Sequence, residues 1–417
     1  MSLRDFRKAG HPPTLLSAFL YFDVSFMVWV ILGPLGLFIG QAYHLSAAQK
    51  GFLTAVPLLG GSCFRPVLGW MTERFGGRRT GLIGLGVTIV PLLIAWLLAD
   101  SFGKFLALGL LLGVAGASFA AALPLASAWY PPEHQGLAMG IAGAGNSGTV
   151  MATLFAPRLA QAIGWRNVFG VAIIPVLLVW IAFFVLAKDA PKKRQVKRWS
   201  DYAAVLKIAD TGWFCFLYSL TFGGFVGLAS YLSIFFHDQY GLSPVQAGDF
   251  TTLVVLFGSF LRPVGGVLAD RVGGHRMLLV VLTGASVCLA VVSTLPPAWV
   301  SLAFLSVAMG MLGMGNGSVF QLMPQRFPQS VGIMTGIVGA AGGFGGFLLP
   351  SLLGLVKGKT GSFGLGFGVL TVLMFAGVGA LLSLRKSWKR TWPREAALRA
   401  GLVKKTVDAA EVYATTA

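Results

Sequence analysis

Apolar runs of about 20 residues or more follow one another along almost the whole chain, separated by short polar segments. A helix of that length is long enough to cross the ~30 Å hydrocarbon layer of a bilayer. The pattern therefore predicts an all-α integral membrane protein with twelve transmembrane helices. These helices are expected over residues 14–40, 47–72, 79–99, 104–129, 137–163, 167–187, 209–236, 245–269, 277–296, 299–325, 332–356 and 362–384.

Composition agrees with a membrane protein and offers little for other chemistries. Of the 417 residues, 56% are hydrophobic, 11% are charged and 56 are glycine, which lies far outside the range of soluble proteins. The sequence has no nucleophile motif, no phosphate-binding loop and no cluster of cysteine and histidine at metal-ligand spacing. We therefore expect neither an enzyme nor a protein that holds a cofactor or a metal.

The net charge of +18 follows the predicted topology. When both termini and the loops after even-numbered spans are assigned to one side of the membrane, that side carries 24 lysines and arginines and the other side carries 6. By the positive-inside rule, this bias predicts a plasma (inner) membrane protein with both termini in the cytoplasm. A nucleic-acid partner is not expected, whereas the basic segment 188–207 and the tail should attract anionic lipid.

The two halves of the sequence repeat each other. Residues 64–79 (FRPVLGWMTERFGGRR) and 261–276 (LRPVGGVLADRVGGHR) are identical at eight of sixteen positions, at a constant offset of 197 residues. An even number of spans in each copy gives both halves the same orientation, with a pseudo-two-fold axis along the membrane normal. We expect a six-helix half over 1–187, a cytoplasmic linker over 188–208, a second six-helix half over 209–385 and a basic cytoplasmic tail over 386–417.

Arg65 and Arg262 occupy equivalent positions in this repeat, inside apolar segments. A cation within hydrocarbon costs at least ~2.5–3.5 kcal/mol on insertion scales, so such a residue is usually paired or functional. Two arginines from equivalent places in two halves indicate a central site for an anion. The alternative is that each arginine only pairs with an acid or with helix carbonyls.

The segment that follows each arginine resembles the loop motif between the second and third spans of the major facilitator superfamily. The residues that carry the resemblance are Gly69, Glu73 and Arg74, repeated as Gly266, Asp270 and Arg271. The resemblance implies a carrier with two six-helix halves. We expect these residues to act as a gating loop between conformations and not as part of the substrate site.

Two glycine-rich runs narrow the resemblance. Residues 139–157 and 334–350, in the fifth and eleventh spans, are similar to the paired nitrate signatures of the nitrate/nitrite porter family. The resemblance implies transport of nitrate and nitrite, and we expect a monomer. Small residues let helices approach closely and slide past one another, although static packing would need them equally. The glycines expected to act in this way are Gly143, Gly145, Gly148, Gly339, Gly342 and Gly343.

The anion explains the choice of arginine. Nitrate is planar and offers acceptor oxygens only, whereas a guanidinium is flat, stays protonated and presents parallel donors. The family resemblance further implies an aromatic and polar lining for the site, from Tyr218, Phe222, Asn146 and Phe119, each of which could instead serve ordinary helix packing. Phe26 and Trp29 of the first span could also face the site, and the sequence does not choose between them.

The sequence leaves two possible energy sources for transport. Asp23, within the first span, is the one acid expected deep in the membrane, and such a residue is a candidate proton site, although it could instead only orient a neighbour. We favour proton-coupled nitrate uptake, with nitrate/nitrite exchange as the alternative. A general efflux carrier of the same superfamily would also fit the topology, but its substrate site would be larger and more apolar.

Overall fold

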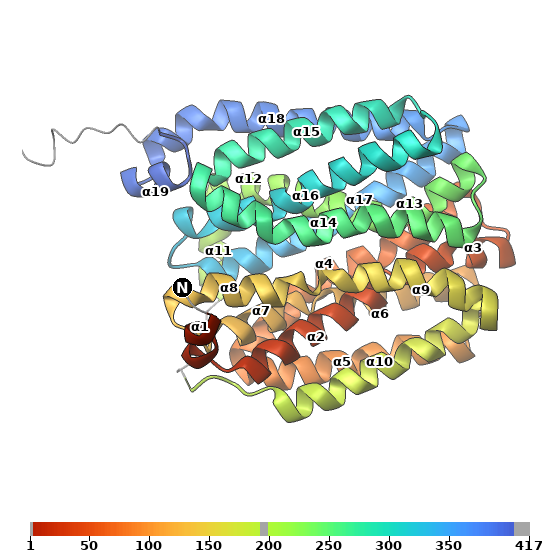
Figure 1. Ribbon diagram of the computed structural model, residues 1–417, viewed down its shortest axis with the longest axis horizontal. Coiled ribbons are helices and arrows are strands. Elements are labelled where there is room, and N and C mark those ends of the chain that lie inside the picture. Colours follow the sequence, from red (N-terminus) through yellow and green to blue (C-terminus); the bar gives the residue numbers. More distant parts are fainter. Residues whose placement is uncertain (1–2, 192–198, 404–417) are drawn as a thin grey trace, which may run out of the picture.

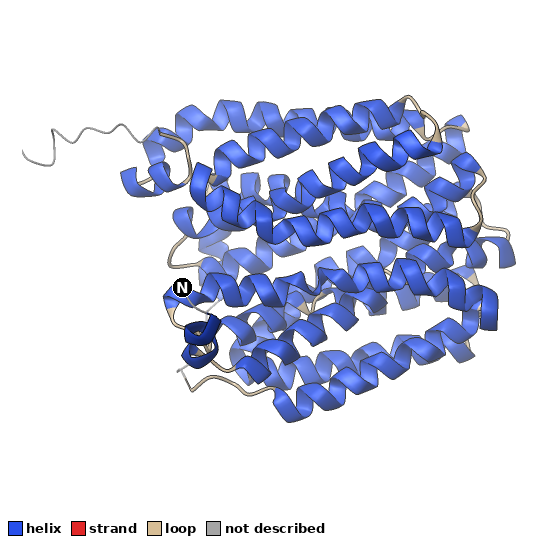
Figure 2. Ribbon diagram, viewed as in Figure 1, coloured by secondary structure: helices blue, strands red, loops and turns tan. Residues whose placement is uncertain are grey.

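The computed structural model describes residues 3–191 and 199–403, and it is built almost entirely of helices joined by short loops (Figures 1 and 2). Eleven helical segments of this part are long and apolar enough to cross a membrane. They correspond to the predicted spans except the fifth, which consists of two α-helices joined by a 3₁₀ turn. The all-α membrane architecture is confirmed.

The first half runs from α1 to α10. Its elements are α1 (Leu3–Ala9), α2 (Pro12–Trp29), α3 (Leu32–Ala42), α4 (Ala47–Phe75), α5 (Gly77–Leu97), α6 (Phe102–Gly116), α7 (Phe119–Ser127), α8 (Pro132–Gly143), the 3₁₀ turn η1 (Ala144–Ser147), α9 (Gly148–Ile163) and α10 (Trp165–Leu186). The second half has α11 (Trp199–Leu206), α12 (Ala209–Tyr218), the π-helical turn η2 (Ser219–Gly223), α13 (Gly224–Tyr240), α14 (Pro244–Val272), α15 (Gly274–Ser293), α16 (Ala298–Arg326), α17 (Val331–Thr360), α18 (Gly364–Thr391) and α19 (Arg394–Arg399).

The sequence repeat is also a repeat of local structure. Helices α4 and α14 both have 29 residues, and each begins with a capping box, formed by Ser46 with Gln49 and by Ser243 with Gln246. Such a box satisfies backbone N–H groups that have no partner in the first turn of a helix. Each helix ends at a glycine with positive φ, 96° at Gly76 and 92° at Gly273, a conformation that favours glycine.

The two halves lie side by side with their helices roughly parallel, the first half from red to yellow-green and the second from green to blue (Figure 1). Contacts between them are made chiefly by α4 with α17 and by α9 with α14. The short helices α1, α11 and α19 gather at one end of the bundle (Figure 1). We call this end the linker side and the other end the opposite side.

Several predicted spans are interrupted rather than continuous. The first divides into α2 and α3, because Pro34 has no N–H to offer the carbonyl of Val30, and this carbonyl accepts from Gly33 N at 2.8 Å instead. The seventh span contains the π-helical turn η2, a distortion that often occurs at functional sites.

The segments predicted as linker and tail are partly helical. The segment 199–206 forms α11, and the last span continues to Thr391, beyond the predicted end at residue 384. The extension is packed, because Trp388 and Trp392 are buried, stack at 4.9 Å and donate from their indole nitrogens to the Asp210 carboxylate. The remaining tail residues, 404–417, lie outside the described part.

Candidate functional site

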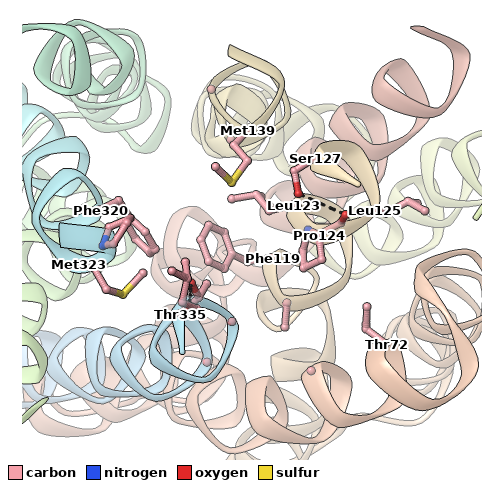
Figure 3. Close-up of a pocket in the computed structure, with 18 of the residues that line it drawn as sticks. Thr72, Phe119, Leu123, Pro124, Leu125, Ser127, Met139, Phe320, Met323 and Thr335 are labelled. Atoms are coloured by element: carbon pink, nitrogen blue, oxygen red, sulfur yellow. Dashed lines mark hydrogen bonds between the residues drawn. The ribbon is translucent and has the colours of Figure 1, made fainter. Parts of the chain in front are cut away.

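A cavity of about 1540 Å³ lies between the two halves and opens toward the linker side. Along α4 its lining runs from Arg65 to Glu73, and along α14 it runs from Arg262 to Asp270, so the two arginines mark its inner end. Figure 3 shows a large part of the wall, which is mostly apolar around Phe119. In each helix the acid near the mouth is the eighth residue after the arginine, a rise of about 12 Å.

Arg65 is 2% exposed and bonds to backbone on both sides of the interface between the halves. Its Nε donates to the carbonyl of Gly116 at 3.2 Å, and its Nη1 donates to the carbonyl of Gly339 in the second half. The guanidinium carbon also lies 5.4 Å from the ring centre of Trp29 and 4.9 Å from that of Phe222. In this conformation Arg65 therefore has the helix-carbonyl partners that the alternative interpretation required.

Arg262 differs from Arg65 in its partners. It is 9% exposed, and its Nη1 is buried without a hydrogen-bond partner among the described residues. Its guanidinium carbon lies 5.9 Å from the ring centre of Phe119, the same distance as that of Arg65, so the two cations share one aromatic ring. A buried donor without a partner is costly, which makes Arg262 the part of the site best prepared to receive an acceptor.

Tyr218 and Phe222 form one aromatic surface beside the arginines. Their rings stack at 5.0 Å with an interplanar angle of 4°, across the π-helical turn η2. Both are buried, and Tyr218 lies within electrostatic range of Arg65 and Arg262. A side chain at Gly342 would lie 2.5 Å from the Tyr218 ring, so this glycine makes room for the aromatic surface.

The structure distinguishes the two aromatic residues of the first span by their contacts with Arg65. Trp29 is completely buried, stacks on Phe222 at 6.4 Å and donates from its indole nitrogen to the carbonyl of Pro57 at 2.6 Å. Glycines at positions 61 and 116 leave the space that the indole occupies. Trp29 contacts the Arg65 cation directly, whereas Phe26 packs behind it against Trp29 and Phe222. The sequence could not separate these two residues because both lie on the same apolar helix.

Asn146 lies in the 3₁₀ turn of the fifth span and is 1% exposed. Neither atom of its side-chain amide has a partner among the described residues, while its backbone carbonyl accepts from the Ser259 hydroxyl at 3.5 Å. Ser259 lies one turn before Arg262 on α14, so the structure brings Asn146 to the interface between the halves.

The six predicted glycines have different surroundings. Gly148 packs against the first span so closely that a side chain would lie 1.8 Å from the carbonyl oxygen of Asp23, and Gly145 packs against the same turn. Gly339 and Gly343 face the first half, at Arg65 and at Ser62. Gly143, in contrast, has open space around its Cα and lines the cavity, so close packing does not explain that glycine.

Asp23 lies beside the 3₁₀ turn and not on the cavity lining. The Ser147 hydroxyl donates to its Oδ1 at 2.5 Å, and the backbone of Gly148 contributes a further hydrogen bond. The acid is therefore joined to the fifth span at the point where its helix is interrupted.

The predicted gating-loop residues line the cavity near its mouth, apart from Arg74 and Arg271, which are exposed. Arg74 stacks on Trp70 at 5.4 Å. Tyr202 of α11 also lines the mouth, and burial, followed by the nearby Glu73 carboxylate, raises the pKa of its hydroxyl above the usual range. The Tyr202 hydroxyl therefore stays protonated. The arginines of the lining, Arg65 and Arg262, lie at the inner end of the cavity, whereas Glu73 and Asp270 lie near its mouth.

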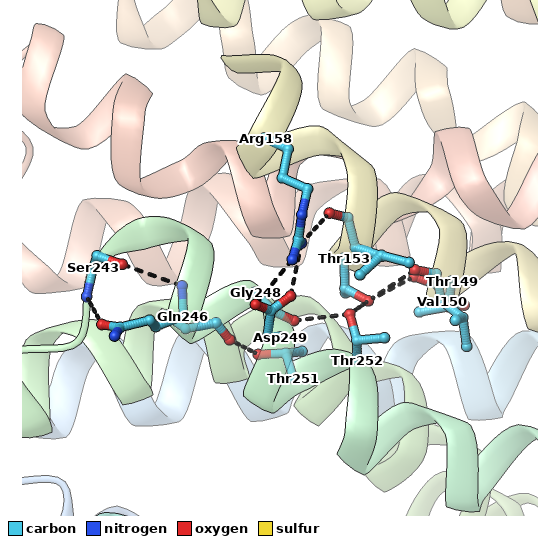
Figure 4. A network of polar contacts seen from close by, with 12 residues as sticks. Thr149, Val150, Thr153, Arg158, Ser243, Gln246, Gly248, Asp249, Thr251 and Thr252 are labelled. Atoms are coloured by element: carbon cyan, nitrogen blue, oxygen red, sulfur yellow. Dashed lines mark hydrogen bonds and ion pairs between the residues drawn. The ribbon is translucent and has the colours of Figure 1, made fainter. Parts of the chain in front are cut away.

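The opposite side is closed by direct contacts between the halves. Figure 4 shows Arg158 of α9 reaching Asp249 of α14, at 2.7 Å, and Thr153 bonding to Thr252 at 2.8 Å. A second ion pair crosses the halves between Lys50 and Asp238, at 2.6 Å. Nearby, a side chain at Gly51 would lie 2.6 Å from the carbonyl oxygen of Pro350. The protein is thus open toward the linker side and closed on the other.

Removing both crossing ion pairs should open this closed side. Ion pairs near the surface contribute ~0.2–1 kcal/mol each, so Lys50→Gln with Arg158→Gln should shift the equilibrium by roughly 0.4–2 kcal/mol, or about two- to thirty-fold. The measurement is the rate of thiol labelling of Thr252→Cys, in detergent, after replacing Cys63, Cys215 and Cys288 with serine. Lys104→Gln is the control, since Lys104 pairs with Asp100 within one half. Equal labelling rates would contradict a role for these pairs in closure.

Several lining residues were not predicted, and two of them lie beside the predicted aromatic residues or the arginines. Phe320 and Asn316, both on α16, belong to the cavity wall, and Phe320 contacts Tyr218 at 5.2 Å and Phe119 at 5.7 Å. The signal for Asn316 was present in the sequence, since an amide is an uncommon residue within an apolar span. Phe320 gave no such signal because apolar residues surround it.

The fold matches solved transporters. A partially occluded inward-open structure of the xylose transporter XylE from E. coli superposes with a TM-score of 0.70 at 14% identity, covering 89% of this chain and 97% of that one. A bacterial homologue of the human lysosomal transporter Spinster gives a TM-score of 0.70 at 17% identity, covering 91% and 97% of the two chains. These two superpositions define the fold, a multi-pass helical membrane architecture of two six-helix halves.

Sequence comparison is more specific. The sequence model of the family described as the Major Facilitator Superfamily matches residues 15–350 of this chain. The nitrite extrusion protein of Bacillus subtilis is 36% identical over 84% of this chain and 89% of its own. A probable nitrate/nitrite transporter, NarK2 of Mycobacterium tuberculosis, is 34% identical over 83% and 89%. A probable nitrate/nitrite antiporter, NarK1 of Thermus thermophilus, is 30% identical over 85% and 87%. The chain belongs to the nitrate/nitrite porter family of the Major Facilitator Superfamily, whose members are transporters.

Proposed function

We propose that this protein carries nitrate and nitrite across the inner membrane by alternating access, with the anion held between Arg65 and Arg262. The relatives named above as nitrate or nitrite transporters support the substrate class. The observation that carries the proposal is the meeting of two buried arginines, from equivalent places in the two halves, at the inner end of one cavity.

The chemistry of the site suits a small planar anion. Two guanidinium groups lie around the Phe119 ring, and stacked Tyr218 and Phe222 provide a flat surface beside them. Nitrate oxygens can accept from the parallel donors of a guanidinium, while the anion's face packs against the rings. The binding of the anion also relieves the repulsion between two like charges in a poorly solvated interior.

The same repulsion provides a reason for the empty carrier to resist closing. With the linker side facing the cytoplasm, as the distribution of basic residues predicts, the conformation described here faces inward. Closing around the site brings the two cations nearer to each other, and this is favourable only when an anion lies between them. In the alternating-access mechanism, one half then rocks against the other around the fixed site.

We propose that nitrate uptake is coupled to protons through Asp23. Moving a monovalent anion inward against a negative potential costs ~2.3 kcal/mol per 100 mV, which symport with two or more protons overcomes. The hydrogen bond between Ser147 and Asp23 supports this role, because protonation of the acid would alter its attachment to the interrupted fifth span. Exchange of nitrate for nitrite is the alternative, and it needs no titratable group.

Transport by purified protein in proteoliposomes tests the function. We expect uptake of labelled nitrate and of nitrite, with pH gradient and membrane voltage varied separately to identify the coupling ion. Protein that is monodisperse and correctly inserted, yet moves neither anion under any gradient, would contradict the proposal.

Selectivity provides a further prediction. Chlorate and other small monovalent oxyanions should inhibit nitrate uptake, whereas sulfate at the same concentration should inhibit it by less than about a tenth as much. Sulfate is tetrahedral and carries four acceptor oxygens, so it cannot lie flat against the rings of Tyr218 and Phe222 and needs more donors than nitrate, and a polar group left unpaired in a low-dielectric interior is costly. The measurement is competition against labelled nitrate at fixed ionic strength. Equal inhibition by sulfate would indicate a larger and more hydrated site.

A further inference from the structure

Asn316 of α16 is a buried amide at the anion cavity whose hydrogen-bonding groups are unused. Its side chain is 0% exposed, and neither its amide oxygen nor its amide nitrogen has a partner among the described residues. It lines the same cavity as Arg65 and Arg262. Buried polar side chains nearly always have a hydrogen-bond partner, so an amide in this position requires a specific explanation.

The repeat places Asn316 at the arginines. Phe119 and Asn316 are separated by the same 197 residues that relate Arg65 to Arg262. Phe119 is the ring that both guanidinium groups contact, at 5.9 Å each. The second half therefore offers an amide at the position where the first half offers an aromatic ring. The two halves therefore contribute the same residue at the arginine positions, but different residues at positions 119 and 316.

Local packing agrees with that placement. A side chain at Gly317, the next residue, would lie 2.8 Å from the carbonyl oxygen of Arg262, so the two helices touch at this level. Phe320 lies one helical turn from Asn316 on the same face of α16, and its ring contacts Tyr218 and Phe119. Asn316 thus lies one helical turn from Phe320, at the level where α16 touches Arg262 of α14.

The donors available to an anion are unequal. Arg65 already donates through Nε and Nη1 to backbone carbonyls, which leaves it fewer donors for a ligand, whereas Arg262 has a free Nη1. Nitrate distributes its charge over three oxygens, and nitrite has only two. The parallel donors of one guanidinium pair with two oxygens, so the Asn316 amide is an additional, neutral donor for the third oxygen of nitrate.

We propose that the Asn316 amide donates to the third oxygen of nitrate and thereby sets the preference of the carrier for nitrate over nitrite. This inference rests on the proposed anion site between the arginines. It assigns the tenth span a role in substrate discrimination, through one neutral hydrogen bond that nitrite does not need.

Steady-state uptake of labelled nitrate and of nitrite by variants in proteoliposomes tests the assignment. Asn316→Leu keeps the approximate volume and removes the amide, and it should raise the nitrate KM about tenfold, the effect of one lost hydrogen bond to a charged ligand. The nitrite KM should change by less than about threefold. Asn316→Ala also removes the amide without added bulk, and it provides the same comparison if the leucine variant is not monodisperse.

Ser318→Ala is the matched control. Ser318 is equally buried on α16, but its hydroxyl is satisfied by the carbonyl of Met314 at 3.0 Å within the same helix, so this variant should leave both KM values unchanged. Equal changes for nitrate and nitrite in Asn316→Leu, or no change for either, would overturn the inference. Arg262→Lys, measured in parallel, separates the two proposals: if it loses transport while Asn316→Leu does not discriminate, the arginine site stands and only the role of Asn316 fails.

Discussion

Lysine in place of Arg262 should reduce nitrate transport to less than about a tenth of the wild-type rate at limiting substrate, although the positive charge is retained. Hydrogen bonds to charged groups contribute about 1.5–3 kcal/mol each, which corresponds to roughly tenfold to a hundredfold in binding. An ammonium is a compact, strongly hydrated charge and cannot present two parallel donors to a planar anion. The free Nη1 of Arg262 is the donor that the substitution removes.

Arg65→Lys should cause a comparable loss for a partly different reason. In the conformation open to the linker side, Arg65 joins Gly116 of the first half to Gly339 of the second, and a lysine cannot make both contacts in the same geometry. We therefore expect Arg65→Lys to alter the balance between conformations as well as anion binding. The Arg262 variant should change binding alone.

Nitrate binding to purified protein, measured by calorimetry alongside proteoliposome uptake, distinguishes these two effects. Arg385→Lys, at an exposed position of α18, controls for the chemical change itself and should transport at the wild-type rate. Unchanged nitrate transport in both Arg65→Lys and Arg262→Lys would reduce the two arginines to structural residues and would remove the basis of the proposed site.

The features that could be predicted from the sequence depend on residues that are close together in the chain, and they occur in both halves. The two buried arginines, Arg65 and Arg262, are each followed by a short motif that recurs in the other half. A repeat at a constant offset doubles that signal. The apolar runs gave the spans directly, because each must be long enough to cross the bilayer.

The features that could not be predicted depend on partners from distant parts of the chain. Trp29 and Phe26 lie on one apolar helix, and only the space left by glycines 61 and 116 decides which of them meets Arg65. The helix breaks at residues 144–147 and 219–223 and the ion pairs between the halves likewise arise from tertiary contact. Hydropathy carries no information about these contacts, nor about the side of the membrane to which the cavity opens.

Asp23→Asn should abolish the part of nitrate uptake that a pH gradient drives, while nitrate/nitrite exchange at uniform pH continues at close to the wild-type rate. Asparagine has the size of aspartic acid and retains an oxygen that can accept from Ser147, but it cannot release a proton. The contact between the first and fifth spans, where Ser147 donates to Asp23 at 2.5 Å, should therefore survive the substitution. Exchange of like anions needs only the arginine pair.

The two activities are measured in the same vesicles, with the voltage held near zero, first under an inward proton gradient and then with nitrite loaded inside. Asp100→Asn, at an exposed loop acid paired with Lys104, is the control and should retain both activities. If the wild type exchanges nitrate for nitrite readily but does not respond to a proton gradient, symport is wrong and exchange is the mechanism. Asp23 then serves only to attach the first span to the interrupted fifth span, and its replacement should affect stability rather than coupling.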